Sequence, residues 1–234
     1  MNLQLRLRLL NKFSTLGVAF ILALGAGGPL GVESAKAEAT FSVYGGHNSS
    51  PHSKVKYDLN LGAGPQDVTV GWDGKSFEMP PYYGVRGTWW LESNPQFGFA
   101  IDFSHAKVYA DPLPAGLSIL EFTDGINFLT ANALYRFQNT TRFTPYGGIG
   151  VGVSIPSVEV ANAAATSKTK NFQLGGVAVQ GLFGVDARIN DNWSLFGELK
   201  SSYTMINADL NGGGSISTNI ISNQIIFGVT YKFF

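Results

Sequence analysis

Apolar and polar residues alternate with a period of two along most of the chain after residue 38. In the segment 97–104, every second residue is aromatic or aliphatic and the residues between them are small or polar. This alternation predicts a strand with one apolar and one polar face. The same pattern recurs at 40–44, 83–91, 129–137, 148–153, 177–186, 195–202 and 224–233. We therefore predict eight strands and no amphipathic helix.

The connections between these strands alternate in length. Short ones cover 92–96, 138–142 and 190–192, and longer ones cover roughly 48–81, 110–125, 155–174 and 209–218. Successive antiparallel strands place short and long connections at opposite ends of a sheet. The pattern predicts an all-β fold, an eight-stranded antiparallel up-and-down transmembrane β-barrel with short periplasmic turns and longer external loops.

Alternation alone does not identify the inner face, since a soluble barrel would enclose its apolar face around a ligand. Three observations favour an apolar outer wall. The polar face is rich in small residues and carries both signs of charge, including Arg86, Asp102 and Glu198; such charges would have to pair in a lumen that has room only for side chains. Aromatic residues such as Trp89 and Trp193 gather near the short connections, as in an interfacial girdle. The aromatic end YKFF resembles the assembly signal of Gram-negative outer-membrane proteins, and in lipid the last strand has to close on the first.

The composition indicates an unusual surface. Charged residues make up only 14% of the chain, against roughly 25% in soluble domains, so much of the surface is hidden or faces something other than water. Lys plus Arg and Asp plus Glu number 16 each, which leaves no basic excess to neutralise nucleic-acid phosphates. Cysteine is absent, and this excludes disulfides, thiolate metal sites and thiol nucleophiles.

The first 37 residues resemble a secretory signal. Basic residues are followed by the apolar run 16–24, and the A-x-A pattern at 35–37 predicts cleavage near Ala37. A membrane anchor is the alternative, but the apolar run is short and ends in a glycine-rich segment containing Pro29. We expect a cleaved signal at 1–37 and an outer-membrane β-barrel domain at 38–234.

Familiar catalytic motifs are missing from the chain, which has no Walker loop, no GxSxG and no HExxH. The glycines of GGIGVG at 147–152 have a spacing that resembles a dinucleotide loop. They alternate with Ile149 and Val151 in a predicted strand, and no helix follows, so they are better interpreted as small residues that face the lumen. No flavin or nicotinamide fingerprint is present, and no cysteine could hold an iron–sulfur cluster.

The stretch WDGKSFEMPPYYG at 72–84 interrupts the alternation. Pro80 and Pro81 cannot donate ladder hydrogen bonds, so they mark a point where sheet pairing stops. We expect the stretch to end the first external loop and to present Lys75, Phe77 and Glu78 above the barrel rim, either as a rigid cap over the mouth or as a substrate contact.

A second set of residues continues the third predicted strand. If the phase of that strand persists, His105, Lys107 and Tyr109 face outward at the level of the lipid headgroups. There Lys107 could pair with a lipid phosphate and Tyr109 could anchor at the interface. The chain's histidines, together with several carboxylates, also map to the external half, where they form either a divalent metal site or a rim of solvated polar residues.

The external segments carry a resemblance to a known family. In order they are PHSKV (51–55), GKSFEMPPYYG (74–84), FSHAKVYAD (103–111), LEFTDGINFLT (120–130) and NADLNGGGS (207–215). From about Thr40 to Phe233 the chain resembles the outer-membrane lipid A oxidases of alpha-proteobacteria, on a small barrel of the OmpA/OmpX type. The resemblance implies oxidation of the proximal glucosamine of lipid A to 2-aminogluconate, with consumption of dioxygen. It assigns no catalytic residue.

Sugar oxidation needs a base near the anomeric hydroxyl and a means of activating oxygen, which a divalent metal could supply. Lys75, Lys107 and Tyr109 are the substrate-binding candidates, and the two lysines could hold the lipid phosphates. The catalytic candidates are His52, Glu78, His105, Asp111, Glu121 and Asp124.

A second hypothesis keeps the same barrel without catalysis, as a structural, adhesive or porin-like surface protein. In both hypotheses we expect a monomer embedded in the outer membrane of a Gram-negative bacterium, with lipopolysaccharide as its neighbour. The compact order of prolines, aromatics and charges in the external segments favours a substrate-binding rim, whereas an eight-stranded lumen leaves little room for a pore.

Overall fold

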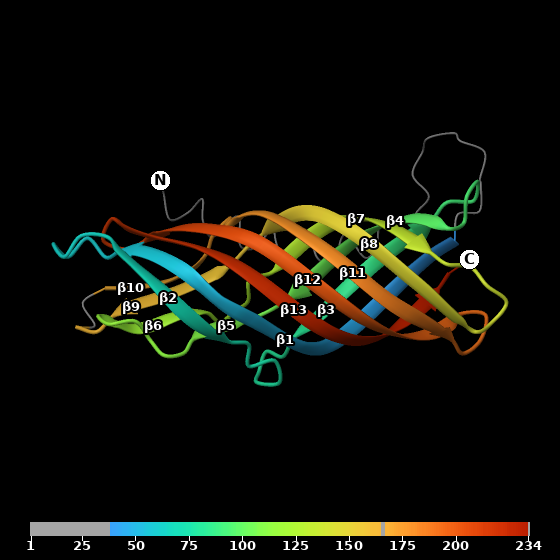
Figure 1. Ribbon diagram of the computed structural model, residues 1–234, viewed down its shortest axis with the longest axis horizontal. Coiled ribbons are helices and arrows are strands. Elements are labelled where there is room, and N and C mark those ends of the chain that lie inside the picture. Colours follow the sequence, from blue (N-terminus) through green and yellow to red (C-terminus); the bar gives the residue numbers. More distant parts are fainter. Residues whose placement is uncertain (1–37, 165–166, 234) are drawn as a thin grey trace, which may run out of the picture. The chain divides into compact units, whose positions relative to one another are not determined.

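The structure, a computed structural model, describes residues 38–164 and 167–233 (Figure 1). The predicted signal at 1–37 lies outside the described residues. No helix in the described part of the chain is long and apolar enough to cross a membrane. The strands are β1 (Glu38–Asp58), β2 (Gln66–Asp73), β3 (Tyr83–Trp90), β4 (Phe97–His105), β5 (Val108–Ala110), β6 (Leu117–Phe122), β7 (Phe128–Arg136), β8 (Phe143–Ser154), β9 (Ser157–Asn162), β10 (Lys168–Phe172), β11 (Gly176–Arg188), β12 (Trp193–Leu210) and β13 (Gly214–Lys232).

Eight of these strands form a closed antiparallel barrel. Their order around the wall is β1, β3, β4, β7, β8, β11, β12 and β13, and β13 pairs back onto β1, with Thr40 opposite Lys232. The short connections 91–96, 137–142 and 189–192 lie at the end of the barrel where β1 begins and β13 ends. The predicted eight-stranded barrel and its short turns are therefore confirmed.

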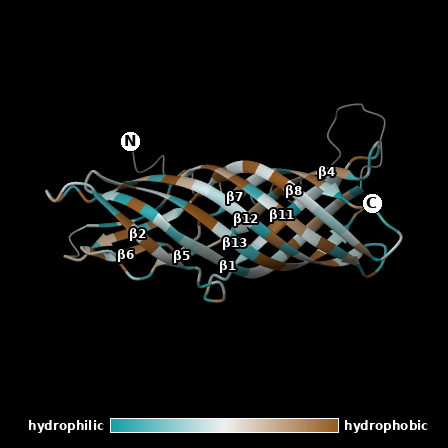
Figure 2. Ribbon diagram, viewed as in Figure 1, coloured by the Kyte–Doolittle hydropathy of each residue, from teal (hydrophilic) through white to brown (hydrophobic). Residues whose placement is uncertain are grey.

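The outer wall of the barrel is apolar. Brown and paler bands alternate along β11, β12 and β13 in Figure 2, as expected for strands with one lipid-facing side. Aromatic rings pair near the short turns, with Trp89 and Phe99 stacked at 5.0 Å and Trp193 and Tyr231 at 4.8 Å between ring centroids. Exposed apolar side chains on the wall include Val43, Tyr83, Phe97, Leu129, Ile149, Val151, Phe183, Leu199, Ile225 and Phe227.

Paired charges cross the lumen of the barrel. Arg86 donates to both carboxylate oxygens of Glu198 at 2.6 and 2.7 Å, and its Nε donates to Asp102 at 2.6 Å. Lys200 donates to Asp102 at 3.1 Å, and the hydroxyl of Tyr44 donates to the same carboxylate at 2.8 Å. Two cations and two carboxylates therefore neutralise one another, which meets the requirement that buried charges be paired.

The segments predicted as long loops contain further strands. β1 continues to Asp58, and β2, β5, β6, β9 and β10 extend the sheet from it in that order. At the far edge, Asn211 donates to the hydroxyl of Thr169 at 2.8 Å and to the carbonyl of Lys168 at 2.7 Å, which joins β10 to the end of β12. We call these five strands, with the outer ends of β1, β12 and β13, the external extension. The predicted long connection at 209–218 is wrong, because only 211–213 lie between β12 and β13.

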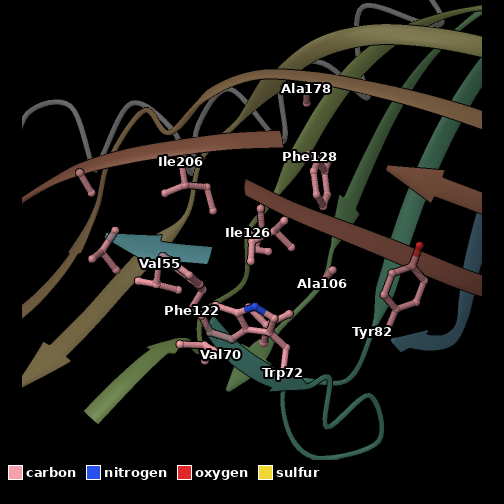
Figure 3. Packing of buried hydrophobic residues seen from close by; sticks show 14 of the residues in the cluster. Val55, Val70, Trp72, Tyr82, Ala106, Phe122, Ile126, Phe128, Ala178 and Ile206 are labelled. Atoms are coloured by element: carbon pink, nitrogen blue, oxygen red, sulfur yellow. The ribbon is translucent and has the colours of Figure 1, made fainter. Parts of the chain in front are cut away.

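The external extension has an apolar core, as Figure 3 shows for side chains from several strands that point toward one another. Its fully buried members include Val55, Val70, Phe122, Ile206 and Ile220. The short strands were predicted as loops because each carries few apolar residues. The outer ends of β12 and β13 were missed because their apolar residues occupy the inward-facing positions, which are polar within the barrel. The burial of this core explains why the extension is ordered sheet.

Candidate functional site

A row of side chains crosses the outer face of the external extension. Asp73 lies opposite Tyr109, Tyr109 opposite Glu121, Glu121 opposite Glu159, and Glu159 opposite Lys170. Residues directly opposite each other on neighbouring strands project from the same face and interact. We call these five residues the outer row. The residues beside them along each strand are buried on the other face: Trp72, Val108, Leu120, Val158 and Thr169.

Two lysines flank the aromatic member of the outer row. Nζ of Lys75 lies 4.4 Å from the centroid of the Tyr109 ring, and Nζ of Lys107 lies 5.7 Å from it. Lys75 is also 3.7 Å from the carboxylate of Glu78. A cation at this distance from an aromatic face is stabilised by the ring quadrupole. Four sequence-predicted residues therefore form one contact group.

Lys107 does not meet the outer leaflet, contrary to the expectation from strand phase. β4 ends at His105, and the loop before β3 covers the lysine, which is almost fully buried and donates to the backbone carbonyl of Glu78 at 2.8 Å. Burial lowers the pKa of Lys107; nearby Glu78 opposes this shift, and Lys75 adds to it. The hydrogen bond from Lys107 holds the loop. Of the two lysines, Lys75 is the one that is accessible to a ligand.

A cleft of about 270 Å³ opens beside the outer row. Lys75, Tyr109, Asp111 and Glu121, all predicted from the sequence, line it together with Asp73. The cleft thus offers one cation, an aromatic hydroxyl and three carboxylates, a set that suits a ligand rich in hydroxyl donors, with Lys75 as the group able to pair with an anion. The remaining lining residues are Ala110, Leu113, Ser118, Ile119 and Leu120.

The carboxylates of the outer row have unequal environments. Burial raises the pKa of Glu121, and the neighbouring carboxylate of Glu159 raises it further. Burial by itself would also raise the pKa of Glu159, but that pKa is lowered because Lys168 and Lys170 donate to its carboxylate at 2.7 and 3.0 Å. Burial and then Glu121 raise the pKa of Tyr109. Glu121 is therefore the more basic carboxylate of the pair and the one suited to accept a proton.

The predicted histidines occupy different places. His52 is exposed on β1. Its Nε2 and the carbonyl oxygen of Asp111 both lie against Gly71, too close to leave room for a larger side chain there. His105 is buried, with its ring stacked on Tyr83 at 5.0 Å. His52 is thus a neighbour of the cleft, whereas His105 is covered.

The turn that precedes β7 covers His105. Nδ1 of His105 lies 2.9 Å from the side-chain oxygen of Asn127, and Nε2 is buried without a hydrogen-bond partner. Asp124 belongs to the same turn and accepts a hydrogen bond from Ser157 at 3.4 Å. These contacts place His105 and Asp124 in the packing between barrel and extension.

The candidate residues do not assemble a metal centre. Within 38–164 and 167–233, no group of three or more His, Cys, Asp or Glu side chains is arranged to hold a metal ion. Protein sites for catalytic zinc, for example, use three such ligands. The donors that were considered for a divalent metal therefore do not fit one, and no catalytic step is assigned to a metal.

Sequence reasoning missed the other half of the outer row. Its members Asp73, Glu159 and Lys170 fall in segments predicted as loops, and so does Lys168, which pairs with Glu159. Cross-strand neighbours cannot be identified before the strand order is known. A signal was present at 157–162, where Val158 and Val160 alternate with Ser157 and Glu159, but 168–172 has a single apolar residue and no such pattern.

Comparison with known proteins identifies a family. The description "Opacity family porin protein" matches residues 91–233. No curated protein sequence matches the chain. Among solved structures, Neisserial surface protein A (NspA) is 16% identical, with a TM-score of 0.47, and the match covers 83% of this chain and 97% of that one. OprG of Pseudomonas aeruginosa is 15% identical, with a TM-score of 0.38 and coverage of 84% and 94%. Ail of Yersinia pestis is 10% identical, with a TM-score of 0.36 and coverage of 81% and 98%.

Proposed function

The chain belongs to the Opacity family of porin proteins and is a β-barrel of the Gram-negative outer membrane, and on that premise we propose that it is an enzyme acting on lipid A. The proposed reaction is oxidation of the proximal glucosamine to 2-aminogluconate, with dioxygen as the electron acceptor. The activity itself comes from the resemblance of the external segments to lipid A oxidases.

The observation that carries the proposal is the convergence of those segments on one cleft. Lys75 follows β2, Tyr109 belongs to β5 and Glu121 to β6, and all three line the cleft. The cleft lies on the outer face of the external extension, beyond the apolar wall of the barrel. A lipid held in the outer leaflet would present its sugar and phosphates at that level.

The chemistry requires loss of the hydrogen on C1 and the hydrogen of the anomeric hydroxyl, together two protons and an electron pair, which converts the hemiacetal to a lactone. Dioxygen takes up both electrons and both protons to give hydrogen peroxide, and water then opens the lactone to the acid. In this scheme Glu121 accepts the hydroxyl proton, because its pKa is raised. Lys75 binds a phosphate, and Lys107 holds the loop that carries Lys75 and Glu78.

The proposal is tested by expressing the chain in a Gram-negative host whose lipid A has a free anomeric hydroxyl, followed by mass spectrometry of the lipid A. We expect a product heavier by one oxygen atom with the parent chain and little or none with Glu121→Gln. Lys56→Ala is the matched control, since Lys56 lies on the same extension, is exposed and forms an ion pair with Asp67 at 3.7 Å. Unchanged lipid A from a folded parent barrel would reject the enzyme.

The alternative is a non-catalytic surface barrel. It is favoured by the match to the Opacity family of porin proteins. Within this alternative a structural or adhesive role fits better than a pore, because the buried Arg86–Glu198 and Lys200–Asp102 pairs cross the lumen. This hypothesis predicts unchanged lipid A and no effect of Glu121→Gln on any lipid product.

A further inference from the structure

The loop between β2 and β3, residues 74–82, projects from the outside of the barrel wall (Figure 1). It carries two large apolar side chains, Phe77 and Met79, that are 80% and 85% exposed, more than any other large hydrophobic side chain in the described part of the chain. Exposure of so much apolar surface to water is unfavourable. The loop does not cap the barrel mouth, as one of the sequence-based expectations had it.

The loop is held against the wall by specific hydrogen bonds. The side chain of Ser76 accepts from the backbone N–H of Asn48 at 2.8 Å and donates to the side-chain oxygen of Asn48 at 2.9 Å. Tyr82 N–H donates to the carbonyl of Ser76 at 2.8 Å, and Lys107 donates to the carbonyl of Glu78. The loop is therefore fixed in a conformation that keeps Phe77 and Met79 exposed.

The position of the loop relative to the lipid-facing wall follows from strand register. The ring of Phe77 stacks on His47 with centroids 5.9 Å apart and an interplanar angle of 17°. His47 lies opposite Ile225, one of the exposed apolar residues of the wall. The next pair whose side chains face outward, two residues further along β1, is Ser49 and Asn223, and both are polar. Beyond that pair, Ile221 and Met205 are again apolar and exposed, so the loop stands in the outer part of the apolar band.

We propose that loop 74–82 is a membrane anchor that inserts Phe77 and Met79 among the acyl chains of the outer leaflet. The partner is a lipid surface, because the two side chains continue an apolar wall that already faces lipid. Lys75, on the same loop, then lies at the headgroup level, where anionic groups are found. This inference does not depend on the proposed oxidation and would hold for a non-catalytic barrel.

The absence of cysteine from the chain allows a direct test with single-cysteine variants. A spin label is attached at F77C or M79C, at I225C as the lipid-facing reference, and at L61C as the water-facing reference, since Leu61 is an exposed residue of the β1–β2 turn. Each variant is folded into phosphatidylcholine vesicles, and collision rates with dioxygen and with a water-soluble nickel complex are measured.

We expect labels at 77 and 79 to show a dioxygen-to-nickel ratio well above that at position 61 and approaching that at position 225. A ratio at either position equal to or below that at 61 would overturn the proposal, because both side chains must enter the lipid. Heat-dependent gel mobility confirms that each variant is folded. The two labels report independently, so a local disturbance at Phe77 leaves Met79 as a test.

Discussion

The barrel wall and the external extension share strands but have opposite chemistry. Along β12, Glu198 points into the lumen and Leu199 points out to lipid. A few residues later, Ile206 points inward and Asn207 points outward. The phase of the strand does not change between these points; only the chemistry of the two faces is exchanged.

The exchange shows that the surroundings of each segment decide which residues it carries. In lipid, apolar side chains face out and the narrow lumen takes polar ones, which must pair. In water the same alternation has to bury its apolar face, as any soluble sheet does. The level at which the faces exchange therefore marks where the chain leaves the membrane, and both the cleft and loop 74–82 lie near that level.

The largest effect should come from breaking the lumen network of the barrel wall. Glu198→Ala leaves Arg86 without its bidentate partner. We expect a loss of about 3–5 kcal/mol in the free energy of unfolding, as for other buried ion pairs with one partner removed. Urea unfolding in phospholipid vesicles measures it, and a loss below about 1 kcal/mol would mean that the pairs contribute little.

A comparable loss is expected in the external extension, but from an apolar residue. Phe122 is fully buried there, and Phe122→Ala should cost about 3–5 kcal/mol by transfer and cavity formation. Limited proteolysis should detect opening of the extension, while the barrel keeps its heat-dependent gel mobility. If the barrel lost its heat-dependent gel mobility together with opening of the extension, the two regions would not be stabilised separately.

The outer faces can be compared by placing the same charge on each. Leu199→Lys puts a cation on the lipid-facing side of β12 and should cost about 2–4 kcal/mol near the middle of the bilayer. Asn207→Lys places it on the exposed outer face of the extension, where surface substitutions usually change stability by less than about 0.5 kcal/mol. Equal losses in the free energy of unfolding for the two variants, measured in vesicles, would contradict the claim that the outer face is apolar at 199 and polar at 207.

The smallest effect concerns pH and the outer row. Because the folded-state pKa of Glu121 is raised, the folded state binds its proton more tightly than the unfolded chain, so this contribution to stability is lost as pH rises through that pKa. Glu121→Gln removes the titration. The stability of this variant relative to the parent should therefore increase from acid to neutral pH, and a flat or falling difference in denaturation midpoint would contradict the burial of Glu121.

The barrel could be predicted from the sequence because alternation reports strands directly, as in the segment 97–104. The external extension could not, because its strands β5 and β10 are short and its apolar core forms only when segments from distant connections pack together. Lys75, Tyr109, Asp111 and Glu121 were identified as candidates from residue type and position, and they do share a cleft. The covering of Lys107 and His105 depends on loops from distant segments, which no local pattern reports.

Oxygen uptake by the purified, folded barrel tests the functional account most directly. The barrel is placed in vesicles that contain lipid A with a free anomeric hydroxyl, and dioxygen consumption, hydrogen peroxide and 2-aminogluconate are measured together. The account predicts equal amounts of all three with the parent chain, and little of any with Glu121→Gln. No oxygen uptake and unchanged lipid A with the folded parent chain would contradict it.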